Sequence, residues 1–293
     1  MELRQVGKNT YYIANPTNIG IYKIDDTNVY LIDSGNDADA GKKIIKIIEE
    51  QGWHIAGIIV THSNADHIGG NKVIQDRLES KVLACKIESC FTEYSILEPA
   101  FLYGGYPFKE IRNKFLMAKP SKTISLEENL PAGLEYFPIR GHFFDMVGLK
   151  TDDDVYFLGD SLFSEETIQK YHIFFIYDVQ EFLRTLDYLE TLKGRLFIPS
   201  HCETTEDIED LIELNRQKIV EITELIHSYL DIPHTFEETL KFLFDHYGLT
   251  MNESQYVLIG STLRSYLSYL KDENRITYYF ENNEMYWCQS KRS

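Results

Sequence analysis

Short runs of β-branched and aromatic residues alternate with longer amphipathic segments up to about residue 200. The runs 18–25 (NIGIYKID) and 28–35 (NVYLIDSG) predict strands, because their composition suits a pleated, half-buried surface. Segment 39–52 (DAGKKIIKIIEEQG) places its isoleucines on one face, which predicts a helix that ends at its glycine. The apolar run 57–62 (GIIVTH) predicts a short buried strand, and 69–80 (GGNKVIQDRLES) predicts the next helix. This alternation is typical of an α/β fold.

Further predicted strands share one feature, which is that each ends in a polar or small residue. These strands are 81–85 (KVLAC), 134–142 (LEYFPIRGH), 154–161 (DVYFLGDS) and 195–201 (RLFIPSH). When strands of a sheet end in histidine, aspartate or serine at the same edge, their loops can converge on one site. We therefore expect a site built from loops that are far apart in the sequence.

The pattern changes at about residue 205, where nearly continuous helical periodicity begins. It ends in 274–289 (NRITYYFENNEMYWCQ), where two β-rich runs flank a predicted hairpin turn at 281–284. We expect a catalytic domain over 1–204 and a mostly helical module over 205–293 that resembles a winged helix. Acidic residues outnumber basic ones about two to one in this module, which argues against nucleic-acid binding.

The whole chain of 293 residues carries a formal net charge of −17. Such a charge disfavours duplex DNA and anionic membranes, since phosphate contacts need lysine and arginine. The N-terminal residues show no apolar segment of signal-peptide length, and no later stretch approaches the length of a membrane span. We expect a cytoplasmic protein that acts on a small molecule, contacts neither nucleic acid nor membrane, and forms a homodimer if the aromatic surface segments pair.

Histidine and aspartate residues gather at the predicted strand ends. Six of them follow four separate strands: His62, Asp66, His67, His142, Asp160 and His201. A single histidine is more often a hydrogen-bonded structural residue than a ligand, but six residues at successive strand ends favour a metal site. Imidazole and carboxylate together suit Zn²⁺, and iron or manganese would also accept them. Gly69 and Gly70 follow the first cluster and let the backbone turn closely beneath it.

These residues resemble the metallo-β-lactamase-fold hydrolases, particularly their glyoxalase-II-like branch. The family pattern His-x-His-x-Asp-His corresponds to 62–67 (HSNADH), and the later ligands correspond to His142, Asp160 and His201. The resemblance covers roughly residues 10–204 and implies a four-layer αββα sandwich. Asp33, in the early LIDSG segment, is expected to contact the metal ligands without binding the metal itself.

The resemblance also implies how the ligands divide between two ions. Site one comprises His62, position 64 and His142, and site two comprises Asp66, His67 and His201, with Asp160 between them. This sequence departs from the family at Asn64, where the family has histidine.

Asparagine can ligate only through its neutral amide oxygen, which is a poorer donor to Zn²⁺ than an imidazole nitrogen. Three outcomes stay open: weak binding with Asn64 as a ligand, a harder ion such as Mn²⁺ or Fe²⁺, or a single metal in site two. The expected cofactor is one or two divalent ions, with zinc first among them.

The function that the resemblance implies is hydrolysis of an ester, thioester or lactone by metal-bound hydroxide. Asp66 is expected to orient the water and to shuttle its proton, and Asp160 to anchor the metals. The alternative is a sensory or non-catalytic protein that kept one metal. Phosphodiester cleavage is less favoured because the surface is acidic. Di-iron redox chemistry is less favoured because Asn64 lacks the charge of a carboxylate.

Segment 91–120 is rich in aromatic residues and too irregular for one helix. It is expected to form an apolar wall or lid over the metals, although core packing or a dimer contact explains the same composition.

Overall fold

The computed structural model describes residues 1–290. Its larger sheet has seven strands that follow one another in chain order. They are β1 (Glu2–Gln5), β2 (Thr10–Ala14), β3 (Ile19–Lys23), β4 (Asn28–Ile32), β5 (His54–Ile59), β6 (Lys81–Ala84) and β7 (Ile124–Ser125). Strands β1 to β4 pair antiparallel, and β4 to β7 pair parallel. The parallel half directs the ends of β4, β5 and β6 to one edge of the sheet.

A second sheet has four strands in the order β11-β10-β9-β8. They are β8 (Leu134–Pro138), β9 (Val147–Thr151), β10 (Val155–Phe157) and β11 (Leu196–Ile198). Strands β10 and β11 are parallel, so the residues that follow both strands lie at the same edge. Sequence reasoning predicted β8, β10 and β11 but did not identify β9, nor β1, β2 and β7 of the larger sheet.

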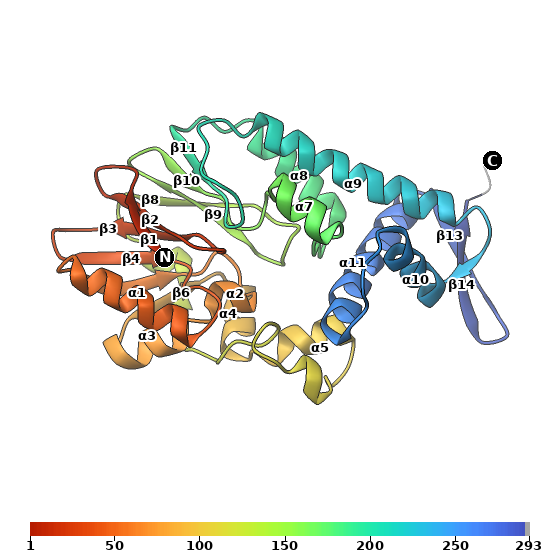
Figure 1. Cartoon of the computed structure of the whole chain (residues 1–293), viewed down its shortest axis with the longest axis horizontal. Helices are drawn as coiled ribbons and strands as arrows, with labels where there is room; N and C mark the ends of the chain where they lie inside the picture. Colours follow the sequence, from red (N-terminus) through yellow and green to blue (C-terminus); the bar gives the residue numbers. More distant parts are fainter. Residues whose placement is uncertain (291–293) are drawn as a thin grey trace.

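Three apolar layers separate the two sheets and their outer helices. Tyr12, Ile59 and Phe157 belong to the layer between the sheets. Helices α1 (Ala38–Glu50) and α3 (Asn71–Leu78) cover the outer face of the larger sheet, and α8 (Val179–Leu189) covers the smaller one (Figure 1). The predicted αββα sandwich is therefore confirmed.

Helix α1 illustrates why these segments fold as they do. The Asp37 carboxylate accepts hydrogen bonds from the backbone N–H groups of Asp39 and Ala40, which satisfies two donors at the start of the helix. Its isoleucine face is buried at Ile44 and Ile48, which are 0% and 1% exposed. The amphipathic pattern read from the sequence thus places one face against the sheet.

The aromatic segment 91–120 contains no single long helix. It begins within α4 (Lys86–Glu93) and continues through α5 (Leu97–Tyr103) and the 3₁₀ helix η1 (Lys109–Ile111). Helix α5 is followed by the capping residue Gly104, whose φ of 79° is in the left-handed region. Shorter helices also connect the strands: α2 (Ala65–Ile68), α6 (Leu126–Asn129) and α7 (Glu165–Tyr171).

The C-terminal part consists of three helices and a small sheet, as the sequence pattern predicts. Its elements are α9 (Glu209–Tyr229), β12 (His234–Thr235), α10 (Phe236–His246), α11 (Glu253–Asp272), β13 (Ile276–Glu281) and β14 (Glu284–Gln289). Asn282 and Asn283 form the hairpin turn with φ values of 50° and 65°. The apolar core runs without a break from α8 to α9 and α11, so the boundary at 204/205 stays a prediction. The last three residues of the predicted module lie outside the described range.

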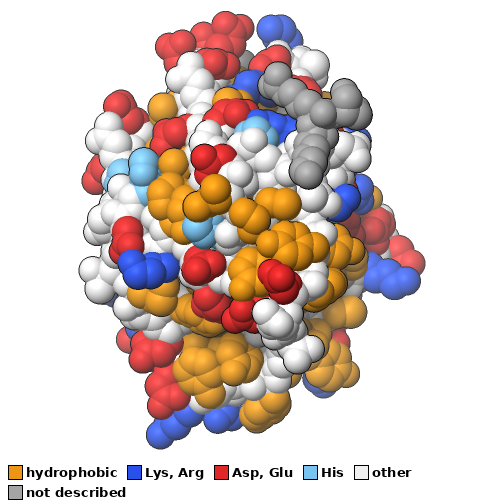
Figure 2. Space-filling model, turned by 90° about the vertical axis from the view of Figure 1, so that its right-hand side faces the viewer, with side chains coloured by type: hydrophobic (Ala, Val, Ile, Leu, Met, Phe, Trp, Pro, Cys, Tyr) orange, Lys and Arg blue, Asp and Glu red, His pale blue; other side chains and the backbone are white. Residues whose placement is uncertain are grey.

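The face at the C-terminal end of the molecule carries hydrophobic side chains among many acidic ones (Figure 2). Tyr278, Tyr279 and Phe280 of β13 are exposed. Within residues 1–290, none of the helices combines the length and apolar character that crossing a membrane requires.

Candidate metal centre

The predicted ligands meet where the two sheets end. His62 and Asp66 follow β5, and His142, Asp160 and His201 follow β8, β10 and β11. Two backbone hydrogen bonds join the sheets beside them, from Val147 N–H to the Thr61 carbonyl (3.0 Å) and from Asn18 N–H to the Ser200 carbonyl (2.8 Å). Residues that are far apart in the sequence are thereby held on one rigid edge.

The loop that carries the first ligands is packed tightly against the loop after β4. A Cβ atom at Gly69 would lie 2.3 Å from the backbone carbon of Asn36, and one at Gly70 would lie 2.3 Å from the carbonyl oxygen of Ser34. Any larger residue would push these loops apart. The two glycines therefore permit the close backbone approach that places α2 under the site.

Asp66, His67 and His201 form one group of potential ligands, whose atoms lie within 4.8 Å of one another. The Asp66 Oδ2 atom is 3.7 Å from Nε2 of His67 and 3.4 Å from Nε2 of His201. The side chain of Asp66 is 41% exposed, whereas that of His67 is fully buried. The three residues predicted for site two are thus together, with Asp66 on the open side.

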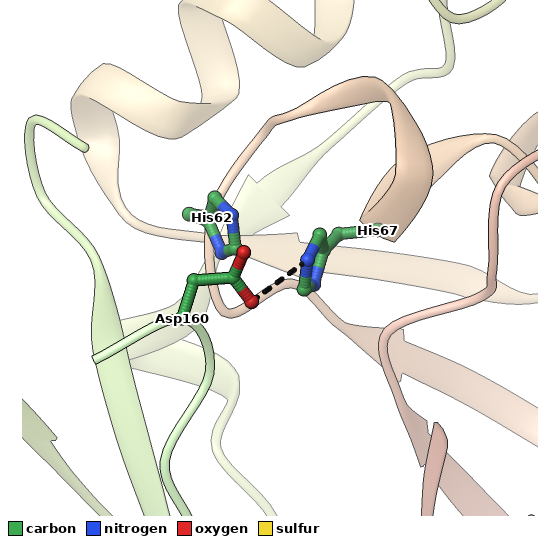
Figure 3. A group of neighbouring side chains, drawn as sticks. All are labelled: His62, His67 and Asp160. Carbon is green, nitrogen blue, oxygen red and sulfur yellow. Dashed lines mark ion pairs between the residues drawn. The ribbon is translucent and has the colours of Figure 1, made fainter. Parts of the chain in front are cut away.

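His62, His67 and Asp160 form a second such group, in which all three side chains point toward one another (Figure 3). The His67 Nε2 and Asp160 Oδ1 atoms are 3.1 Å apart. Both atoms are buried and face each other as an ion pair, whereas Nε2 of His62 is buried and has no hydrogen-bond partner. Buried polar atoms are rarely left without partners, so the His62 nitrogen facing this pair favours a cation at this point.

Asn64 and His142 complete the cluster. The Asn64 Oδ1 atom lies 3.1 Å from Nε2 of His142, which in turn is 3.6 Å from Oδ2 of Asp160. The His62 ring lies between its neighbours, with its centroid 3.9 Å from that of His67 and 5.1 Å from that of His142. The structure therefore brings all seven predicted residues together, while their division between two ions stays a prediction.

Each of the four imidazoles has an acceptor for its Nδ1–H on the outside of the cluster. His67 contacts Asp33 Oδ2 (2.7 Å), His62 contacts Thr61 Oγ1 (3.0 Å), His142 contacts the Phe175 carbonyl (2.8 Å) and His201 contacts the Pro16 carbonyl (2.9 Å). With the proton on Nδ1, every Nε2 lone pair points inward. This is the usual arrangement of histidines that bind a metal.

Asp33 orients two of the imidazoles at once. Its carboxylate accepts the His67 contact and also hydrogen bonds from the backbone N–H and the hydroxyl of Thr61 (2.8 and 2.7 Å). Because the Thr61 hydroxyl donates to Asp33, it is left to accept from His62. The supporting role expected for Asp33 thus has a direct geometric basis.

Burial and charge divide the histidines into two kinds. Burial lowers the pKa of His62 well below its ordinary value and also lowers the pKa of His142, so both imidazoles are neutral. Burial acts in the same direction on His67 and His201, but nearby carboxylates, above all Asp160, outweigh it and raise the pKa of both well above the ordinary value. A metal bound by these two imidazoles requires both in the neutral form, so metal binding would compete with their protonation.

The donor set fits a divalent metal. Four inward Nε2 atoms and two carboxylates suit zinc, and the amide oxygen of Asn64 adds a harder ligand. The orphaned Nε2 of His62 is the observation that argues most directly for a cation in this place.

Two buried glutamates near the ligands were not identified from the sequence. Glu88 of α4 accepts hydrogen bonds from the backbone N–H and hydroxyl of Ser63 (2.9 and 2.6 Å) and from Asp145 N–H (2.8 Å). Burial raises its pKa to about 7. Glu98 of α5 accepts a hydrogen bond from Asn64 Nδ2 (2.7 Å). Glu88 lies in the helix after β6 and Glu98 in the next helix, and no sequence signal marks either glutamate as buried.

A cavity of about 910 Å³ opens beside site two and is lined by Asp66 and His201. Aromatic side chains form much of its wall, together with α11 of the C-terminal part. These wall residues are Phe115, Phe163, Phe174, Phe175, Leu258 and Ile259. Only Phe115 comes from segment 91–120, so most of the apolar wall lies elsewhere than the sequence predicted.

A family model described as the metallo-beta-lactamase superfamily matches residues 12–201. The chain belongs to the metallo-beta-lactamase superfamily. The family resemblance expected from the sequence is therefore confirmed, whereas its glyoxalase-II-like branch stays a prediction. No curated protein matches the chain.

Solved structures of this superfamily share the fold at low sequence identity. A metallo-beta-lactamase family protein from Thermus thermophilus is 17% identical with a TM-score of 0.71, covering 96% of this chain and 98% of its own. A beta-lactamase domain protein from Burkholderia ambifaria is 14% identical with a TM-score of 0.72, covering 99% and 94%. A metallo-beta-lactamase from Pontibacter korlensis is 13% identical with a TM-score of 0.53, covering 75% and 98%. At such identities the likeness concerns the fold alone.

Proposed function

We propose that the protein is a metal-dependent hydrolase that cleaves an ester, thioester or lactone. The observation that carries this proposal is the convergence of four inward-facing Nε2 atoms and two aspartates beside a cavity. A scaffold that kept only one structural ion would not need ligand atoms on both sides of Asp160.

A bound divalent ion, zinc in the first instance and iron or manganese as alternatives, supplies an activated water and polarises the substrate carbonyl. Asp160 lies 3.1 Å from His67 Nε2 and 3.2 Å from His201 Nε2, so its carboxylate holds the centre of the cluster. This side chain is 6% exposed, which keeps it away from substrate.

Asp66 is the carboxylate that reaches the reacting atoms, because it lines the cavity and is the more exposed of the two aspartates. Its Oδ2 atom contacts both histidines of site two and accepts a hydrogen bond from the Thr17 hydroxyl (3.2 Å). The other oxygen, Oδ1, is then free to orient the attacking water and to take its proton.

The cavity favours a substrate with an apolar acyl or aryl group. Its volume suits a small organic molecule, and aromatic and aliphatic side chains line it together with Asp66 and His201 of site two. Lys170 and Arg4 also line it and would bind a carboxylate or another anionic group on the same substrate.

The test is hydrolysis of a matched panel: acyl esters, acyl thioesters and acyl lactones of increasing chain length, with a β-lactam and a phosphodiester for comparison. The protein is assayed metal-free and after reloading with zinc or manganese. We expect turnover of at least one acyl class, dependent on metal and rising with acyl length. Stoichiometric metal binding without turnover of any member would favour the sensory alternative instead.

A further inference from the structure

The side chain of Asn64 is held between two partners that define its orientation. Its Nδ2 group donates to Glu98 Oε1 at 2.7 Å, and its Oδ1 atom faces His142 Nε2 at 3.1 Å. Because His142 uses its Nδ1–H on the Phe175 carbonyl, the two facing atoms are both acceptors. Two acceptors at this distance repel each other unless a cation lies against both.

Glu98 has an unusual environment for a carboxylate. It is 5% exposed, and no lysine, arginine or histidine within residues 1–290 forms an ion pair with it. A buried carboxylate without a compensating charge is costly. A divalent ion bound by Asn64 would provide that charge one hydrogen bond away.

We propose that Glu98 is the positioning residue that makes Asn64 a metal ligand, and that the pair replaces the histidine that the family has at position 64. The carboxylate fixes the amide so that oxygen rather than nitrogen faces His142. By accepting from Nδ2 it also draws negative charge onto Oδ1, as a carboxylate does for a metal-bound histidine. Site one then has two imidazole nitrogens and one strengthened oxygen.

Such a donor set shifts the preference of site one from zinc toward harder ions. Site two, with two imidazoles and the Asp66 carboxylate, keeps its preference for zinc. The proposal rests on the proposed function only in assuming that the cluster binds metal, and it makes site one the manganese- or iron-selective half of a mixed centre.

A purely structural role for Glu98 predicts something different. In that case the hydrogen bond joins α5 to the ligand loop, and its loss lowers the melting temperature without changing metal preference. Metal binding and thermal stability therefore have to be measured on the same variants.

The experiment uses the full chain, stripped with a chelator and titrated separately with Mn²⁺ and Zn²⁺. Calorimetry gives the number and affinity of the sites, and electron paramagnetic resonance reports bound Mn²⁺ without reference to activity. The variants are Glu98→Gln, which keeps one acceptor but removes the charge, and Glu98→Ala, which removes both. Glu110→Gln is the control, an exposed glutamate in the same segment.

We expect two ions per wild-type chain. Glu98→Gln should weaken Mn²⁺ binding at one site about tenfold and Glu98→Ala about a hundredfold, with zinc binding at the other site unchanged. In Asn64→His, the site should prefer Zn²⁺ over Mn²⁺.

Three results overturn the proposal. Glu98→Ala with wild-type affinities at both sites would make Glu98 structural. A single ion per wild-type chain would exclude an occupied site one but leave hydrolysis at site two standing. Binding of neither ion would reject this proposal and the proposed function together.

Discussion

The two predicted halves of the candidate metal centre share the six-residue loop 62–67 but carry their negative charge in different places. In site two the Asp66 carboxylate is itself among the predicted ligand atoms, 3.4 Å from His201 Nε2. In site one the position of Asp66 is taken by Asn64, which is neutral. The negative charge belongs to the Glu98 carboxylate, which accepts a hydrogen bond from Asn64 Nδ2 at 2.7 Å. Charge that contacts an ion directly favours tight binding, whereas charge behind a neutral ligand tunes which ion binds.

This difference teaches that a substitution in a ligand motif cannot be judged from the motif alone. Asn64 taken by itself weakens site one. Under our proposal, Asn64 and the buried Glu98 together supply a polarised oxygen ligand beside His142. The following predictions test whether the two halves really differ, beginning with the largest effect.

Removing the carboxylate of Asp160 should prevent metal binding at both sites and so abolish the difference between them. Asp160 contacts His67 and His201 of site two and lies 3.6 Å from His142 of site one. We expect Asp160→Ala to lower metal affinity at both sites by more than about a hundredfold. Loss of a residue that only hydrogen-bonds to a metal ligand costs about 10- to 100-fold, and loss of a ligand itself should cost more. Elemental analysis of purified protein measures it, alongside hydrolysis. Full metal content with full turnover would contradict the scheme.

Glu88 should affect the stability of the fold near site one, because its carboxyl group accepts hydrogen bonds from both the Ser63 loop and the Asp145 loop. Burial raises its pKa from 4.5 to about 7. A raised folded-state pKa means that its stabilisation is complete below pH 4.5 and is lost as the pH rises to about 7. Relative to Glu88→Gln, the wild-type free energy of unfolding should fall by about 3 kcal/mol across this range.

Urea unfolding of both metal-free proteins at several pH values measures this difference, in which the titration of other groups cancels. A difference that stays constant from pH 4.5 to 7 would mean that Glu88 does not change its protonation there.

The smallest effects should come from the residues that hold the imidazoles from outside. Thr61→Val removes the hydroxyl that contacts His62 Nδ1 and should weaken site one about tenfold; site two should weaken less, because the same hydroxyl also donates to Asp33, which contacts His67. Asp33→Asn should weaken both sites by about 10 to 100-fold, because Asp33 contacts His67 directly and His62 through Thr61. Asparagine tolerates the positive φ of 64° at this position.

Metal titration of the two variants side by side checks this order. Equal losses at both sites in Thr61→Val would show that the halves are not separable.

Much of the fold and of the ligand set could be predicted from the sequence because the necessary signals are local. Helix α1 shows its buried face in its own residues, and the strands before His62, Asp160 and His201 are apolar runs that end at a ligand. Strand β1 (ELRQ) is polar, β7 has 2 residues and β9 (VGLKT) includes glycine and lysine, so these three carry weak local strand signals. Strand β2 (TYYIA) has strand-forming residues, and its place in the sheet was settled by its pairing with β1 and β3.

The sequence by itself determined the alternation of strands and helices and the order of ligand-type residues at the strand ends, since both follow from hydrophobic periodicity, and the resemblance of its motifs to a known family implied the sandwich. Only the tertiary structure decided which side chains Asn64 contacts. Its partner Glu98 is 34 residues away, Glu88 meets Asp145 across 57 residues, and Leu258 of α11 reaches the cavity from the C-terminal part. Such contacts depend on the packing of whole elements against one another, and no local pattern of residue types records which buried carboxylate faces which ligand.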